Sequence, residues 1–345
     1  MSVEISGPAE ENAIAAANIY GKYSARKPVT RWVSRRLVSA TFGAIAKVAS
    51  RAARPELMSP AVRRALHWAG SGLALFGVIF VALRLRDYSA GLDFSRLNTA
   101  TWLAITGLVL LCAIANLILA LAWWHLLGQF DARVSRRWAM RTYGVSYLAK
   151  YVPGSIVHLA GRQAMGMAAG VPGWAVARSS LWEHGLISVA GGMFAILSLP
   201  LLVPGLLVVI SAGLFVIALG IVVGLFSHLI GRRVSRAFAL YVAFLAISGL
   251  VFATLIALVG FIHEISFDKW FLFCGAYVLA WLIGLVTPGA PAGIGIRELV
   301  LLFLLQGEVS ETDLVLAVLL ARIVTVGGDM ITYIGAMTIK SDNQG

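Results

Sequence analysis

The sequence predicts an all-α, polytopic membrane protein built from two inverted repeats, with about six transmembrane helices and two re-entrant helical hairpins. Its 345 residues are 59% hydrophobic and only 13% charged, whereas a soluble domain carries about 25% charged residues. Several apolar runs reach the ~20 residues that a helix needs to span a bilayer. Two similar stretches, "KYVPGSIVHLAGRQ" at 150–163 and "LVTPGAPAGIGIRE" at 285–298, each place an arginine nine positions after a proline.

The first 65 residues form a basic extension that holds 11 of the 28 lysines and arginines. Within it, apolar residues recur at helical spacing over 29–54, with basic residues between them. This pattern fits either a helix lying on anionic lipid or a solvated basic tail. Together with the arginine-rich connectors 130–141 and 231–236, the extension favours a cytoplasmic N-terminus by the positive-inside rule, and it does not favour a nucleic-acid partner.

The transmembrane domain is expected over 66–340, where apolar runs alternate with short polar connectors. The segments 143–171 and 268–306 are interrupted by proline and glycine, and we expect each to enter and leave the membrane on one side. A full span over 270–287 is the alternative for the second of them. The uninterrupted predicted spans are 66–83, 100–127, 174–199, 201–227, 237–261 and 313–338.

This division gives two units, 66–199 and 201–338, each with three spans and one hairpin. Three is an odd number, so the second unit is expected to be inverted relative to the first. The basic connectors then lie on the cytoplasmic side, and the acidic loop 307–313 lies outside. Inverted repeats with broken helices near the membrane midplane are typical of transporters.

The two breaks predict a polar cavity inside the membrane. Proline removes an amide donor and glycine loosens the backbone, and freed backbone groups are tolerated there only within protein or around water. Helix arms that restart after a break direct their N-terminal amides into the gap and attract anions. The residues expected to contact an anionic substrate are Lys150, Pro153, Gly154, Arg162, Pro288, Gly289, Gly293, Gly295, Arg297 and Glu298.

Arg162 and Arg297 are the strongest of these candidates. An arginine at mid-membrane costs roughly 2.5–3.5 kcal/mol on insertion scales, and two guanidinium groups can hold a phosphate by forked hydrogen bonds. In one alternative, Arg297 pairs with Glu298 or Asp329 and locks the fold. In another, both arginines extend to opposite interfaces.

Further ionisable residues lie inside the predicted helices. We expect them to form a charged network that holds a counter-ion or relays protons, with interhelical ion pairing as the alternative. These residues are His158, Arg178, Glu183, Arg322 and Asp329. No motif for a nucleotide, metal or other cofactor, and no catalytic constellation, is recognisable.

Two longer stretches, "SYLAKYVPGSIVHLAGR" and "PGAPAGIGIRELVLLFLL", resemble the two signature regions of the lysylphosphatidylglycerol synthase transmembrane-region family. "SSLWEHG" is similar to a serine-to-glutamate element of that family, which would map to Glu183. The likeness covers roughly 65–340. The sequence departs from the family in its Ala-Pro-Ala-Gly, where a glycine pair is common, and in its basic extension.

The resemblance implies a lipid translocase of the bacterial cytoplasmic membrane. Its substrate would be a phospholipid or a polyprenyl-phosphate-linked sugar, and a separate glycosyltransferase or lipid synthase is a candidate partner. We expect no lysyl-lipid synthesis, because the chain has no room for the family's aminoacyl-transferase domain. A lipid flippase that is not an enzyme is therefore the preferred reading.

Two other functions remain open from the sequence. One is an integral-membrane transferase with a lipid-linked donor, which would need Glu183 or Asp329 as its general base. The other is a non-catalytic partner that anchors a glycosyltransferase through the basic extension.

Overall fold

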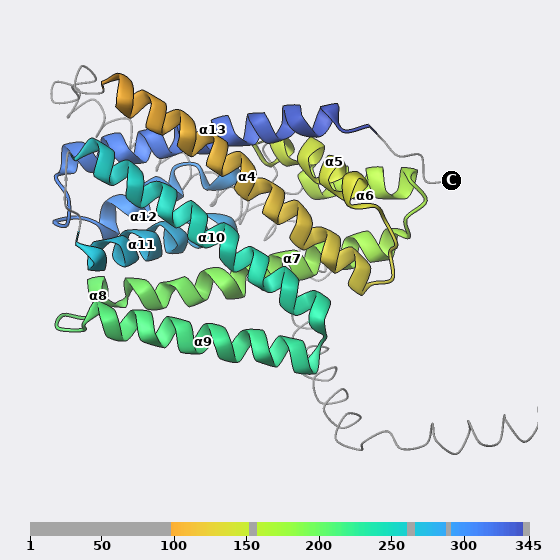
Figure 1. Ribbon diagram of the computed structural model, residues 1–345, viewed down its shortest axis with the longest axis horizontal. Coiled ribbons are helices and arrows are strands. Elements are labelled where there is room, and N and C mark those ends of the chain that lie inside the picture. The colour runs from red at the N-terminus through yellow and green to blue at the C-terminus, as the bar shows by residue number, and fades with distance from the viewer. Residues whose placement is uncertain (1–97, 152–156, 261–265, 288–290, 341–345) are drawn as a thin grey trace, which may run out of the picture. The chain divides into compact units, whose positions relative to one another are not determined.

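The computed structural model describes residues 98–151, 157–260, 266–287 and 291–340 (Figure 1). Over these residues the chain is helical and contains no β-strand. The basic extension, with its predicted helix at 29–54, and the predicted span 66–83 lie outside the described residues. The helices are α4 (Thr99–Gln129), α5 (Arg136–Tyr147), α6 (Val157–Ala168), α7 (Gly173–Phe194), α8 (Leu199–Leu202), α9 (Val208–Leu229), α10 (Arg232–Val259), α11 (Phe267–Val286), α12 (Ile296–Leu304) and α13 (Glu311–Thr338), with 3₁₀ turns η2 (Leu148–Tyr151), η3 (Ala195–Ser198) and η4 (Pro291–Gly293).

Six helical stretches of the described chain are long and apolar enough to cross a membrane. This confirms the prediction of an all-helical chain suited to a multi-pass membrane protein. Five of the stretches match the predicted spans 100–127, 174–199, 201–227, 237–261 and 313–338 to within a few residues. The sixth is the 20-residue α11, which corresponds to the alternative reading of 270–287 as a full span.

The helix ends follow from local chemistry. The carboxamide of Asn98 accepts a hydrogen bond from the amide of Thr101 and caps α4, and Ser135 caps α5 in the same way. Ser310 caps α13, whose first turn carries Glu311 and Asp313. These carboxylates lie where the helix dipole favours negative charge.

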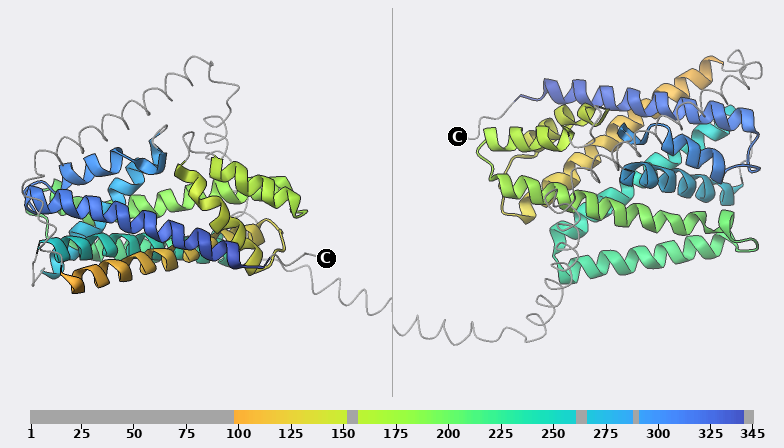
Figure 2. Two further views of the ribbon diagram at one scale, coloured as in Figure 1. Left: turned by 90° about the horizontal axis from the view of Figure 1, so that it is seen from above. Right: turned by 180° about the vertical axis from the view of Figure 1, so that it is seen from behind.

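α4 lies beside α10 and α13, and the left view of Figure 2 shows it, in orange, at the edge of the bundle. α10 packs in turn on α11, where the ring of Phe252 stacks on that of Tyr277 with the ring centres 5.1 Å apart. The fully buried aromatic residues on these three helices include Trp123, Phe238, Phe252 and Phe273. In contrast, α9 buries only one of its apolar side chains, that of Phe226. Such a surface suits contact with lipid tails.

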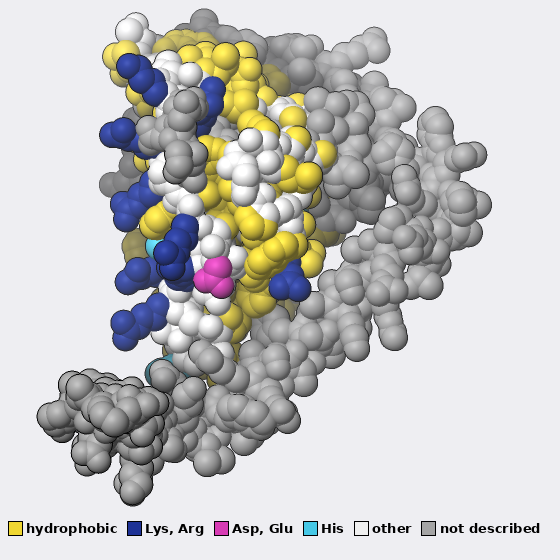
Figure 3. Space-filling model, turned by 90° about the vertical axis from the view of Figure 1, so that its right-hand side faces the viewer, with side chains coloured by type: hydrophobic (Ala, Val, Ile, Leu, Met, Phe, Trp, Pro, Cys, Tyr) yellow, Lys and Arg dark blue, Asp and Glu magenta, His cyan; other side chains and the backbone are white. Residues whose placement is uncertain are grey.

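The basic connectors gather at one end of the bundle. Gly128, at the end of α4, lies against the guanidinium of Arg233, at the start of α10. Figure 3, which views this end, shows the Lys and Arg side chains collected there. At the other end, Lys269 Nζ lies 3.8 Å from Glu308 Oε2.

The contact of Lys269 with Glu308 also shows where the second interrupted segment begins and ends. Lys269 belongs to the first turn of α11, and Glu308 follows α12, so the segment 267–308 starts and finishes at the same end of the bundle. In the first interrupted segment, the Gln163 carboxamide of α6 donates to the carbonyl of Gly173, at the start of α7, at 2.9 Å. In Figure 1, α5 and α6 lie toward one end of the bundle, and α11 and α12 lie toward the other.

Candidate functional site

A cavity of about 310 Å³ is lined by described residues of both interrupted segments. The turns η2 and η4, which belong to the two interrupted segments, lie against each other beside it. Both Arg162 and Arg297 line this one cavity. The remaining charged residues of its described wall are Lys150, Glu183, Arg322 and Asp329.

Arg162 is neutralised within the wall of the cavity. Only 1% of its surface is exposed, and Nη1 lies 2.5 Å from Glu183 Oε2. The hydroxyl of Tyr143 donates to the other oxygen of Glu183 at 2.7 Å, and the Arg162 guanidinium lies 3.9 Å from the centre of the Tyr143 ring. The pair joins α5, α6 and α7, as in the ion-pairing alternative, and leaves Arg162 poorly placed to bind a ligand.

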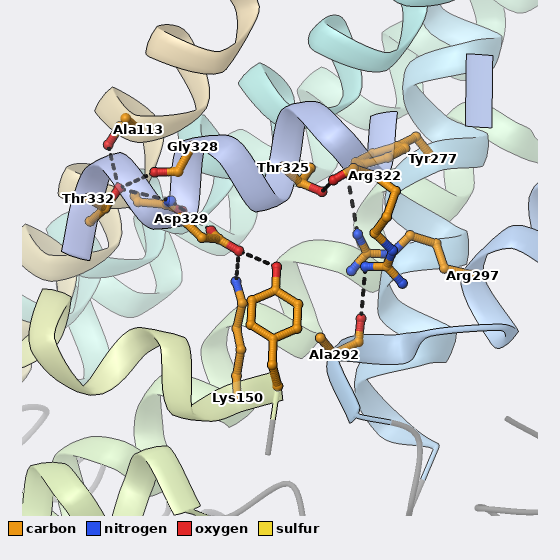
Figure 4. A network of polar contacts seen from close by, with 12 residues as sticks. Ala113, Lys150, Tyr277, Ala292, Arg297, Arg322, Thr325, Gly328, Asp329 and Thr332 are labelled. Carbon is orange, nitrogen blue, oxygen red and sulfur yellow. Dashed lines mark hydrogen bonds and ion pairs between the residues drawn. The ribbon is translucent and has the colours of Figure 1, made fainter. Parts of the chain in front are cut away.

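Asp329 is the centre of a second cluster (Figure 4). One carboxylate oxygen lies 2.8 Å from Lys150 Nζ and accepts a hydrogen bond from the Tyr151 hydroxyl at 2.5 Å. The other oxygen accepts from the Asn116 carboxamide at 2.9 Å. Since Lys150 lies on η2 and Asp329 on α13, this ion pair joins the first interrupted segment to α13 in the wall of the cavity. We refer to it as the Lys150–Asp329 latch.

Glu298 holds the restart of the second broken helix. One of its oxygens accepts from the amide of Gly295 at 2.7 Å and caps α12. The other lies 2.8 Å from Arg322 Nη2. Glu298 was expected to contact substrate, but both of its oxygens already have partners in the protein.

Arg297 differs from the other cavity cations. It forms no ion pair with any described residue, and its Nη1 donates a long hydrogen bond to the Tyr277 hydroxyl at 3.5 Å. Its Nε is buried without a hydrogen-bond partner among the described residues, a feature that it shares with the Nε of Arg162. The expectation that Arg297 pairs with Glu298 or Asp329 is wrong for the described chain, because Arg322 and Lys150 hold those carboxylates.

The other sequence-predicted residues have different positions. His158 lines the cavity, with its ring centre 6.2 Å from that of His184. Arg178 does not belong to the cavity network, since it is exposed and stacks on Trp174. Gly293 lines the cavity, and Gly295 immediately precedes α12. Pro153, Gly154, Pro288 and Gly289 lie outside the described residues.

Three polar residues of the cavity were missed by sequence reasoning. They are Asn116, Tyr143 and Tyr277, and each contacts a charged side chain. Asn116 carried a usable signal, because a carboxamide within an apolar span requires a buried partner. The tyrosines carried none, because an aromatic residue in a membrane helix is most often explained by packing or by the interface.

The second break depends on a close approach of two glycines. Gly293 has φ +68°, and a Cβ added to Gly284 would lie 3.1 Å from the Cα of Gly293.

We expect Gly293→Ala to destabilise the protein by about 1–2 kcal/mol, because alanine is strained at this φ and would meet the α11 backbone. Thermal unfolding in detergent measures the effect. Gly192→Ala in α7 is the control, since no atom lies within 4 Å of its added methyl group. Equal stability of the two variants would contradict the close approach.

Comparison with known proteins gives no further assignment: no family model, no curated protein and no solved structure matches the chain. Within the described ranges, no three His, Cys, Asp or Glu residues are grouped as metal ligands would be.

Proposed function

We propose that this protein is a lipid flippase that moves an anionic, phosphate-containing lipid between the two leaflets of a membrane. The observation that carries the proposal is Arg297, a guanidinium without a carboxylate partner in the described wall of a cavity inside an apolar helical bundle. Arg297 is half-buried, and a charge in such a site within an apolar bundle is costly unless an anion compensates it. The planar fork of arginine suits the oxygens of a phosphate, while the tail of the lipid stays among lipid tails.

The proposed mechanism is alternating access between two inverted units. In it, 143–171 and 268–306 are re-entrant hairpins that enter from opposite faces. The return of 267–308 to one end of the bundle, and the contact of η2 with η4, support this arrangement. The Lys150–Asp329 latch closes the cavity between the units, and its opening exposes the cavity to one leaflet.

The proposed location is the bacterial cytoplasmic membrane, with the basic end of the bundle in the cytoplasm. We expect a cysteine at Glu308 to be labelled from outside only, and a cysteine at Arg133 from the cytoplasm only, since the two positions lie at opposite ends of the bundle. The native Cys112 and Cys274 are buried and are replaced beforehand. A membrane-impermeant maleimide added to right-side-out or inverted vesicles measures the labelling. Labelling at 308 from the cytoplasm would exclude this orientation.

The transferase and anchoring alternatives gain no support from the cavity. Both carboxylates that a transferase would need as a general base are held by cations and by hydroxyl donors. Anchoring of a glycosyltransferase or lipid synthase rests on the basic extension, which lies outside the described residues.

Reconstitution tests the proposed transport. The purified chain is placed in liposomes containing phosphatidylglycerol with a fluorescent acyl chain, and dithionite is added to destroy label in the outer leaflet. We expect label from the inner leaflet to become accessible in vesicles that contain the protein, and not in protein-free vesicles. Equal protection in both preparations would reject the flippase. Loss of function in cells only after deletion of 1–60, with no effect of cavity variants, would favour the anchoring role.

A further inference from the structure

We infer that the cavity binds a headgroup with a single negative charge, a phosphodiester, and that Arg297 and Arg322 form its anion subsite. This inference rests on the proposed function and names the substrate class of the same cavity. It also replaces the pair expected from the sequence, Arg162 with Arg297, by two arginines that both belong to the second unit.

The charge balance of the cavity leaves one positive charge. Its described wall holds four cations and two carboxylates, and Glu298 adds a third carboxylate through its ion pair with Arg322. Arg162 is balanced by Glu183, Lys150 by Asp329, and Arg322 by Glu298. The uncompensated charge therefore belongs to Arg297. This count covers the lysines, arginines, aspartates and glutamates of the described wall.

The second arginine lies beside the first. Arg297 extends from α12 and Arg322 from α13, and their guanidinium groups converge above the carbonyl of Ala292 (Figure 4). Arg322 contacts that carbonyl from Nη1 at 3.5 Å and Glu298 from Nη2 at 2.8 Å. Two like charges side by side repel each other, and the repulsion is costly where little water screens it. An anion bound between the two guanidinium groups removes this cost.

Hydrogen-bond donors lie around the guanidinium group of Arg297. The Nε of Arg297 is buried and lacks a partner among the described residues, and the Tyr277 hydroxyl lies within 3.5 Å of its Nη1. A phosphodiester offers two free oxygens, and these match the paired N–H groups of one guanidinium. The hydroxyl and Arg322 then supply further donors without any change in the ion pair of Arg322 with Glu298.

The single positive charge left in the cavity determines which lipid headgroups it favours. One negative charge neutralises the cavity, whereas a headgroup with no net charge gives no compensation. A phosphomonoester or a diphosphate brings more negative charge than the wall can balance. An excess buried charge of either sign is penalised, so the phosphodiester is favoured over both.

Binding of matched lipids tests the inference. The purified full chain in detergent is titrated with three dioleoyl lipids, namely phosphatidylglycerol, phosphatidylcholine and phosphatidylinositol 4-phosphate, and affinity is measured by native mass spectrometry. We expect phosphatidylglycerol to bind at least about tenfold more tightly than the other two. Arg297→Gln is expected to remove that preference by weakening phosphatidylglycerol about tenfold. Arg178→Gln, at an exposed arginine outside the cavity, should change nothing.

A second variant reverses the selectivity. Glu298→Gln keeps a side-chain oxygen that can cap α12 but removes one negative charge, so the 4-phosphate should bind more tightly relative to phosphatidylglycerol than in the wild type. The inference is overturned if the wild type binds the 4-phosphate as tightly as phosphatidylglycerol, or if Arg297→Gln keeps wild-type affinity and selectivity. Selective binding without any flux in liposomes would reject the flippase and leave the inference standing. Flux that does not depend on the charge of the headgroup would support the flippase and reject the phosphodiester subsite.

Discussion

Glu183→Gln is expected to destabilise the protein by about 3–5 kcal/mol, which is the largest loss expected from any single change considered. The glutamine leaves the Arg162 guanidinium buried at 1% exposure without its counter-charge. It also changes the acceptor of the Tyr143 hydroxyl and so weakens the junction of α5, α6 and α7. Chemical or thermal unfolding in detergent measures the loss.

Glu308→Gln is the matched control for that change. Glu308 also belongs to an ion pair, with Lys269, but both side chains are more than a third exposed and the nitrogen and oxygen are 3.8 Å apart. Such a pair contributes at most about 1 kcal/mol. Replacing Arg162 and Glu183 together by methionine should recover part of the stability that Glu183→Gln loses, because no isolated charge is then buried. If Glu183→Gln unfolds like the Glu308 control, the buried pair does not hold these helices together.

Arg297→Lys is expected to reduce lipid flux about tenfold or more while leaving the stability of the fold nearly unchanged. Lysine keeps the charge but loses the planar fork that binds two phosphate oxygens at once. The fold should tolerate the change, because Arg297 forms no ion pair with the described residues. Flux in proteoliposomes and thermal unfolding are measured on the same preparation. Arg178→Lys, outside the cavity, is the control, and full flux in Arg297→Lys would point to a role as a simple point charge.

Five of the predicted spans, and the lining of one cavity by both interrupted segments, could be predicted from sequence because they depend on local patterns. An apolar run has a length that can be compared with a bilayer, and proline with glycine marks a break wherever it occurs in such a run. Arg322 and Asp329 are seven residues apart, so two helical turns place them on one face of α13, and both line the cavity.

The pairing of charges could not be predicted, because it depends on how the helices are rotated. Arg178 and Glu183 lie on the same helix, but five residues turn the chain by about 500°, which places them on different faces. Glu183 therefore lines the cavity and Arg178 does not. The same limit applies to Glu298, which pairs with Arg322 of a neighbouring helix while its own neighbour Arg297 remains unpaired in the described chain.

In the proposed flippase, the lipid headgroup passes through the cavity that is lined by both interrupted segments. Flux in proteoliposomes of a cavity-filled variant, Ser248→Trp, tests this passage most directly, because Ser248 is a half-buried, uncharged residue of the cavity wall on α10. The control is Gly213→Trp on the exposed α9, where no atom lies within 4 Å of an added Cβ. We expect flux to be lost in Ser248→Trp and kept in Gly213→Trp, with both variants folded by thermal unfolding. If the Ser248→Trp variant is folded and its flux is undiminished, the headgroup does not pass through this cavity.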